Sequence, residues 1–352
     1  TPNDAYLFAK GAGIEHASGF EMKMKKPLDF LAVSDHAFYL GMMRELASAN
    51  SPYSEEEMAD AVRGATTPEG SQAGFAAVLG HMRRQSADTV DPIDDRSVAR
   101  SAWQEIIEAA QRHNDPGNFT TFIAYEYTSS GSAFENLHRN VIFRGSEVPL
   151  QPYSRFDSIN PEGLWAWMDE QRALGREALA IPHNSNGSNG WMFPMNNWAG
   201  EPIDVEYAQT RMRNEPLVEN TQVKGTSDTH PLLSPNDEWA DFEIMPLRIA
   251  TDIASKPSGS YVREAYLNGL MIESKIGANP YKFGVIGASD THNAAGSFEE
   301  DNYWSKTGVL DFEPYRRGSV PTPTSSPANP EYLDPASKYW GASGLAGVWA
   351  ES

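Results

Sequence analysis

Histidine and carboxylate side chains recur beside the ends of short apolar segments in this sequence. Six residues share that placement: His36, Glu126, His138, His183, Asp290 and His292. Short apolar segments are typical of buried strands, and enzymes built on parallel sheets carry their reactive groups where the strands end. The chain has no cysteine, so only imidazoles and carboxylates are available as strong metal ligands. This donor set favours Zn, Mn or Fe ions.

The types and spacing of three of these residues favour more than one metal ion. Asp290 and His292 are two residues apart, so on an extended strand both side chains would leave the same face. Glu126 carries two carboxylate oxygens and can bridge two cations, which a neutral imidazole cannot do. Asp35, beside His36, would point to the opposite side and is assigned to a helix cap or to orienting an imidazole.

Other histidines and acids are ranked lower as ligands. The tetrapeptide Ser-Asp-Thr-His occurs at 227–230 and again at 289–292. In the first copy, Asp228 and His230 follow a polar segment without a buried strand, which favours an ordinary loop. Three further histidines lie in helical or loop segments and are expected to be solvated: His16, His81 and His113.

Two basic residues, Lys224 and Arg139, lie nearest in sequence to these strand ends. Either side chain could hold an anionic oxygen of a substrate. For each residue taken singly, an ordinary surface salt bridge is the favoured interpretation. Trp191 and Trp198 could line a substrate pocket or pack a loop.

The apolar segments alternate with helical patterns, which is typical of α/β proteins with parallel sheets. We expect strands at Leu28 to Val33, Phe119 to Tyr125, Asn140 to Phe143, Ala178 to Ile181, Leu217 to Gln222 and Phe283 to Ala288. We expect helices at Ser97 to His113, from Pro161 to just before Gly175, and from about Tyr261 to Ile276. The opening Thr1-Pro2-Asn3-Asp4 predicts another helix, with Thr1 as its cap.

We predict a single domain over residues 1–352, interrupted by insertions at about 41–95 and 187–214. A Pro-rich segment at about 314–339 predicts an irregular surface excursion. No strand precedes the first helix and no helix closes the chain, so we expect truncation at both ends.

Composition excludes several classes of protein. The chain has 352 residues, 40% of them apolar, and a formal charge of −20, which would repel a nucleic-acid backbone. No apolar run reaches the roughly 20 residues that cross a bilayer. We therefore expect a soluble protein that binds neither nucleic acid nor membrane. The compartment, cytoplasmic or periplasmic/secreted, stays open, and so does the oligomeric state.

The motif series resembles the PHP (polymerase and histidinol phosphatase) superfamily of metallohydrolases. The motifs are Leu-Asp-Phe-Leu-Ala-Val-Ser-Asp-His, Tyr-Glu-Tyr, His-Arg-Asn, Pro-His-Asn and Gly-Ala-Ser-Asp-Thr-His, in that order along the chain. Their closest likeness is to the PHP-like branch designated domain of unknown function 3604.

The resemblance implies a distorted (β/α)7 barrel, without its first strand in this chain, and two or three divalent metal ions at one end. By the motifs, Glu126 is similar to the bridging carboxylate, with His138 and His183 on the second metal and Asp290 on the first. His36 and His292 would share a third site. The family's opening His-x-His strand would precede Thr1.

The sequence thus predicts a metal-dependent hydrolase. The resemblance favours a phosphoesterase with a metal-bound hydroxide as nucleophile and a small anionic substrate. The predicted catalytic residues are Glu126, Arg139 and Lys224. The alternatives are hydrolysis of another ester, a sulfate or an amide, or a non-catalytic PHP-like metal-binding module.

Overall fold

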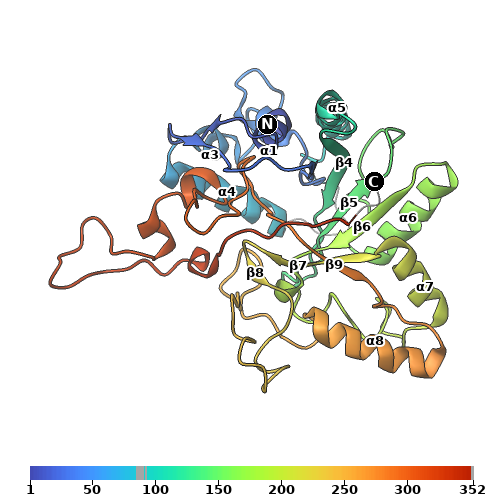
Figure 1. The fold of residues 1–352 in the computed structure, drawn as a ribbon. Coiled ribbons are helices and arrows are strands. Elements are labelled where there is room, and N and C mark those ends of the chain that lie inside the picture. The colour runs from blue at the N-terminus through green and yellow to red at the C-terminus, as the bar shows by residue number, and fades with distance from the viewer. Residues whose placement is uncertain (85–90, 92, 350–352) are drawn as a thin grey trace.

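Three small open sheets, of four, three and two strands, make up the described part of the fold together with the helices packed around them (Figure 1). The computed structural model describes residues 1–84, 91 and 93–349. The helices are α1 (Pro2–Ala9), α2 (Met42–Ala47), α3 (Ala59–Arg63), α4 (Pro68–Arg84), α5 (Arg96–His113), α6 (Pro161–Ala173), α7 (Val205–Asn214) and α8 (Val262–Ile276). The strands are β1 (Ile14–Glu15), β2 (Glu21–Met22), β3 (Phe30–Val33), β4 (Thr120–Tyr127), β5 (Arg139–Phe143), β6 (Ala178–Pro182), β7 (Leu217–Gln222), β8 (Gly225–Thr226) and β9 (Gly284–Gly287).

Strands were predicted at six places, and all six hold a strand with small differences at the ends. The three interior helices and the opening helix were also predicted correctly. Thr1 caps α1, with its side chain accepting a hydrogen bond from the backbone of Asp4. Among the described residues, no helix combines the length and the apolar character needed to cross a bilayer.

The predicted distorted (β/α)7 barrel is wrong. Strands β3, β4, β5 and β6 pair in that order as one sheet, and β8, β7 and β9 form a second, so no closed barrel occurs in the described part of the chain. A barrel of this kind needs parallel neighbours, yet β5 runs antiparallel to both β4 and β6. Residues 128–138, which join β4 to β5, contain no helix that could carry the chain back to the start of the sheet. The next strand therefore returns antiparallel.

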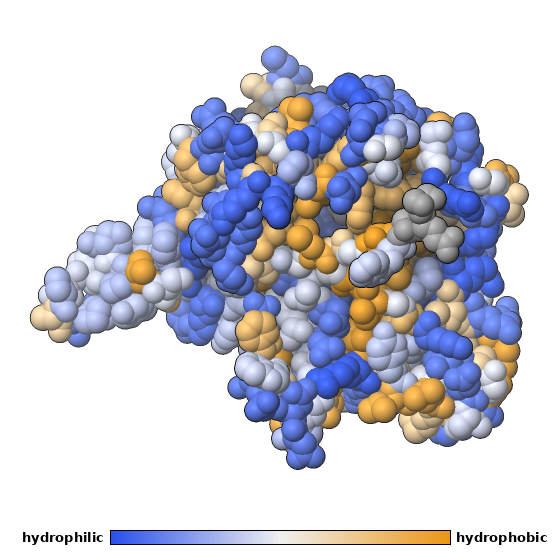
Figure 2. Space-filling view, in the orientation of Figure 1, coloured by the Kyte–Doolittle hydropathy of each residue, from blue (hydrophilic) through white to orange (hydrophobic). Residues whose placement is uncertain are grey.

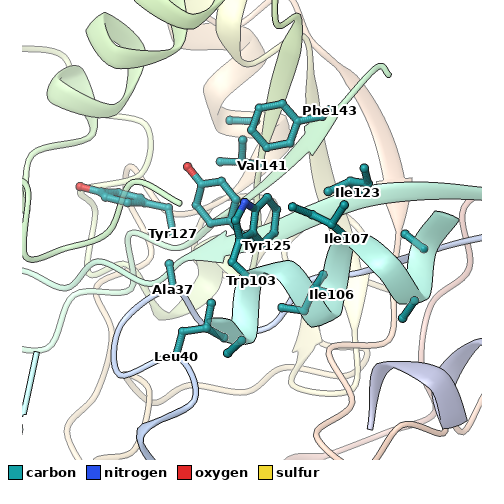
Figure 3. Packing of buried hydrophobic residues seen from close by; sticks show 14 of the residues in the cluster. Ala37, Leu40, Trp103, Ile106, Ile107, Ile123, Tyr125, Tyr127, Val141 and Phe143 are labelled. Carbon is teal, nitrogen blue, oxygen red and sulfur yellow. The ribbon is translucent and has the colours of Figure 1, made fainter. Parts of the chain in front are cut away.

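One face of the first sheet packs against the main apolar core (Figure 3). Tyr125 and Tyr127 of β4 and Val141 of β5 are fully buried there, and α5 covers them with Trp103. The Trp103 indole donates a hydrogen bond to the carbonyl of Pro149 at 2.8 Å and meets the Tyr125 ring edge-on. The buried polar N–H is thereby satisfied, and the core fixes which way the side chains of β4 point.

The insertion predicted at 41–95 carries α2, α3 and α4 and a separate apolar cluster that includes Met42, Leu46 and Ile93. Residues 85–90 and 92 of this insertion lie outside the described residues, as do residues 350–352 at the end of the chain.

The second predicted insertion, 187–214, ends in α7. The Pro-rich segment at 314–339 projects from the body and contains two short 3-10 turns, Pro314–Arg317 and Ala336–Tyr339 (Figure 1). Hydrophilic side chains cover most of the face in Figure 2, and apolar ones gather near its middle.

Helix α5 depends on Asp95 at its start. The Asp95 Oδ1 accepts hydrogen bonds from the backbone N–H groups of Ser97 and Val98 at 2.7 and 3.3 Å. Hydrogen bonds from Tyr53 and then Ser97 lower the pKa of Asp95 from 3.8 to about 2. We predict that Asp95→Ala lowers the free energy of unfolding by about 1 kcal/mol at neutral pH, measured by urea denaturation, because the cap is lost.

Asp95→Asn, which keeps an acceptor but no charge, separates the cap from the ionised carboxylate. A carboxyl whose pKa is lower in the folded state stabilises the fold above its unfolded pKa. The stability difference between wild type and Asp95→Asn should therefore narrow as the pH falls from about 4 to about 2. A stability difference that stays constant between about pH 4 and about pH 2 would contradict the lowered pKa of Asp95.

Candidate metal centre

The register of the first sheet brings three of the predicted ligands to one face. In β4 and β5, Glu126 pairs with Asn140, and in β5 and β6, Asn140 pairs with Ile181. Side chains alternate along a strand, so those of Glu126 and Asn140 point away from the apolar core that buries Tyr125 and Val141. His138 and His183 lie just beyond the paired residues, where the His183 N–H donates to the His138 carbonyl at 3.2 Å.

His36 joins this group from β3. It forms an isolated parallel bridge with Glu126, with backbone hydrogen bonds from Glu126 to Asp35 at 2.8 Å and from Ala37 to Glu126 at 2.9 Å. The continued pairing beyond Val33 holds the His36 imidazole beside the Glu126 carboxylate. The role expected of Asp35, as a helix cap or as a residue that orients an imidazole, stays a prediction.

The Glu126 carboxylate lies at the middle of this group and is 4% exposed. Its Oε1 is 2.8 Å from His138 Nδ1 and 3.3 Å from His36 Nδ1, and its Oε2 is 3.7 Å from His183 Nε2. Burial alone would raise the pKa of Glu126, but the nearby imidazoles outweigh burial and hold it well below its usual range. The carboxyl group is therefore ionised despite its burial.

Three of these side chains fit a divalent metal. Glu126, His138 and His183 each offer a ligand atom, and these atoms lie within 4.8 Å of one another. Burial lowers the pKa of His183 to about 4, so its imidazole is neutral near pH 7, which is the form that ligates metals. Its Nδ1 is buried without a hydrogen-bond partner. An ionised carboxylate and neutral imidazoles are the donor set that Zn and similar ions take in proteins.

Asp290 and His292 lie beside the same centre, but not on a strand. Strand β9 ends at Gly287, and Asp290 has a left-handed φ of 53°, so the predicted extended geometry is wrong. The turn still keeps the pair together, with His292 Nδ1 4.0 Å from Asp290 Oδ1. The His292 ring lies 5.4 Å from that of His36, centroid to centroid, which connects the pair to the Glu126 group. The structure thus brings all six predicted ligands together, and their role as ligands stays a prediction.

The predicted basic residue Lys224 lies within this centre. Its ammonium forms a close ion pair with Asp290 Oδ2, and both side chains are at least nine-tenths buried. Burial would raise the pKa of Asp290, but Lys224 and then Lys306 outweigh it and lower that pKa.

Three residues of the centre were missed by the sequence analysis. The Thr128 hydroxyl lies 2.8 Å from Glu126 Oε1 and 2.7 Å from His36 Nδ1, and its position two residues after Glu126 could have indicated it. Glu219 of β7 is buried, and burial followed by repulsion from Asp290 raises its pKa to about 8. Lys306 follows no strand and carried no sequence signal.

Arg139 points away from the centre, because it neighbours His138 on the strand and so faces the other side of the sheet. Its Nε is 2.9 Å from Glu215 Oε1, in an ion pair that is almost completely buried. Arg211 lies 3.1 Å from the other oxygen of Glu215. Arg139 also lines a hollow of about 400 Å³, together with Trp191 and Trp198, whose rings meet edge-on at 5.6 Å.

The remaining predicted residues lie elsewhere. Asp228 forms an ion pair with Arg263 at 3.1 Å, and His230 packs against Tyr261, as expected of an ordinary loop. The three histidines expected to be solvated are buried, so that prediction is wrong: His16, His81 and His113. Each has a polar partner that stabilises it inside the protein, namely Ser305, Asp91 and Asn3 in turn.

The buried ion pair between Arg139 and Glu215 predicts a loss of stability when Arg139 is replaced. We expect Arg139→Met to lower the free energy of unfolding by about 3 kcal/mol, because a buried Glu215 loses one of its cations. Urea denaturation measures the loss. Arg144→Met is the matched control, since Arg144 is 82% exposed in its pair with Glu177, and its effect should stay within about 0.5 kcal/mol. Unchanged stability of Arg139→Met, together with weaker binding of an anionic substrate, would instead support Arg139 as a substrate contact.

Comparison with known proteins gives a family and no closer relative. No curated protein sequence and no solved structure matches the chain. The model of one family, described as a protein of unknown function (DUF3604), matches residues 1–352. The chain belongs to the DUF3604 family.

Proposed function

We propose that this protein is a metal-dependent hydrolase whose centre is built on Glu126. The observation that carries the proposal is the buried group of Glu126, His138 and His183, whose ligand atoms lie within 4.8 Å of one another. Burying an ionised carboxylate among imidazoles costs free energy of folding. A buried charge of this kind therefore points to a functional role.

A divalent ion bound there would supply an activated water molecule and would offset the charge that develops on the reacting group. The protein's own residues have separable tasks in this proposal. Glu126, His138 and His183 hold the ion, and Asp290, His36 and His292 extend the site to one or two further ions. Thr128 orients the carboxylate and the His36 ring through its hydroxyl.

The substrate is proposed to be a small phosphoester. Lys224 offers a buried ammonium at the edge of the centre, which suits an anionic oxygen. The choice of phosphorus rests on the resemblance of the ordered motifs to the PHP superfamily, and that resemblance is part of the proposal. Another ester, a sulfate or an amide would use the same activated water.

Glu126→Gln tests the centre directly. We predict that the wild-type chain binds Mn or Zn and that Glu126→Gln lowers the affinity for the metal by at least about 100-fold, because the charge is removed while the shape is kept. Equilibrium dialysis followed by elemental analysis measures the bound metal. The same substitution should also lower kcat more than His183→Ala does, with p-nitrophenyl phosphate and bis(p-nitrophenyl) phosphate as substrates.

Glu177→Gln is the matched control, because Glu177 is a half-exposed carboxylate paired with Arg144 and lies outside the centre. It should bind metal and turn over substrate as wild type does. Metal binding without turnover of any ester, sulfate or amide would favour the non-catalytic metal-binding module. Equal metal binding by wild type and Glu126→Gln would remove the proposed centre.

A further inference from the structure

Lys306 is a buried lysine beside the candidate metal centre, and burial lowers the pKa of its side chain to about 7. Its side chain is 3% exposed, and its ammonium lies 2.8 Å from His292 Nδ1 and 4.0 Å from Asp290 Oδ2. The backbone around it is fixed at both polar groups: the Lys306 N–H donates to Asp311 at 2.8 Å, and its carbonyl accepts from the His292 N–H at 2.8 Å. These two bonds hold the backbone of Lys306 beside His292 and Asp311.

The hydrogen bonds of Lys306 are incomplete. An ammonium has three N–H donors, and within the described residues the only acceptor at hydrogen-bond distance is the imidazole of His292. The ring of Trp340 lies 5.5 Å from the ammonium and offers only a weak cation–π contact. Burial of an ammonium with spare donors is costly, so this arrangement suits a ligand that brings acceptors.

Asp290 forms ion pairs with two lysine side chains beside the centre. The Asp290 Oδ2 is in close contact with the Lys224 side chain and lies 4.0 Å from that of Lys306. The His292 Nδ1 lies 2.8 Å from the Lys306 nitrogen and 3.0 Å from the Asp290 carbonyl oxygen, and an imidazole supplies no negative charge in either role. Lys224 and Lys306 belong to segments that are far apart in sequence. Each lysine is therefore positioned by a different part of the chain. Within the described residues, no other carboxylate lies within 4.0 Å of either lysine nitrogen, so an oxyanion could accept the hydrogen bonds that Asp290 leaves unmade.

We propose that Lys306 and Lys224 together form a binding site for the oxyanion group of the substrate, with phosphate as its chemical class. The inference rests on the proposed function and deepens it, since it names the group that the protein holds beside the metal centre. Two ammoniums from separate segments suit a tetrahedral group with several anionic oxygens, because each lysine can bind a different oxygen. Lys306 takes the place that the sequence analysis gave to Arg139.

Binding of inorganic phosphate to the full chain tests the proposal without any turnover. Isothermal titration calorimetry is carried out on metal-free protein and on Mn-loaded protein, with sulfate in a parallel titration. Lys306→Met keeps the length and apolar body of the side chain, and we expect it to raise the Kd for phosphate at least about tenfold in both forms. Lys306→Arg keeps the charge and should retain most of the binding. Lys25→Met, at a half-exposed lysine paired with Asp301, is the matched control and should bind as wild type does.

The outcomes separate this site from the metal centre. Weaker phosphate binding by Lys306→Met with unchanged metal content supports the proposal. Unchanged phosphate binding overturns it, as does the failure of metal-free and Mn-loaded wild type to bind phosphate, or sulfate binding as tight as phosphate. Loss of metal together with phosphate in Lys306→Met also overturns it, because the lysine then acts through the metal. If Lys306→Met does not fold, Lys224→Met and Lys306→Arg give the same comparison. The metal content of Glu126→Gln judges the proposed function independently of these results.

Discussion

The ionised carboxylate of Glu126, buried among imidazoles, is the interaction on which the rest of the centre depends. A buried charge is tolerated only where its surroundings compensate for the water it has lost. Here the compensation comes from His36, His138 and His183, each of which arrives from a different strand end. The pairing of β3, β4, β5 and β6 is therefore a condition for the ionisation of one side chain.

That pairing is itself fixed on the other face of the sheet. Tyr125 and Val141 are buried under α5, and a strand whose apolar side chains are buried has little freedom to shift along its neighbour. The apolar core and the polar centre are thus two consequences of the same alternation. Stability is provided on one face, and the chemistry proposed here uses the other.

Much of this could be predicted from the sequence. The apolar runs located the strands, and the residues beside them included the six that gather around Glu126. The alternation of side chains would also have separated Arg139 from His138, because adjacent residues of a strand face opposite sides. Basic character alone does not bring a residue to a site.

Three other features could not be predicted from the sequence: the strand directions, the turn at Asp290 and the position of Lys306. The reasons are physical. The resemblance implied a barrel, and the alternation of apolar runs and helices favoured parallel strands. Periodicity does not report the direction of a strand, however, and the link at 128–138 lacks the helix that a parallel return requires. The left-handed turn at Asp290 depends on tertiary contacts. Lys306 reaches the centre through contacts between residues far apart in sequence, which no local pattern encodes.

The two ends of β5 differ in how they would respond to a change in chain length. Residues 128–138 join β4 to β5 without a helix, so a residue gained or lost near the turn of this link can be absorbed by the loop. A residue lost within β5 would exchange its two faces. Arg139 would then turn toward the imidazoles and Asn140 toward the core, and Glu215 would lose its partner. The middle of the link, at about 131–134, can thus vary in length, whereas its ends carry Thr128 and His138 of the centre. The length of β5 is tied to the charge balance on both sides of the sheet.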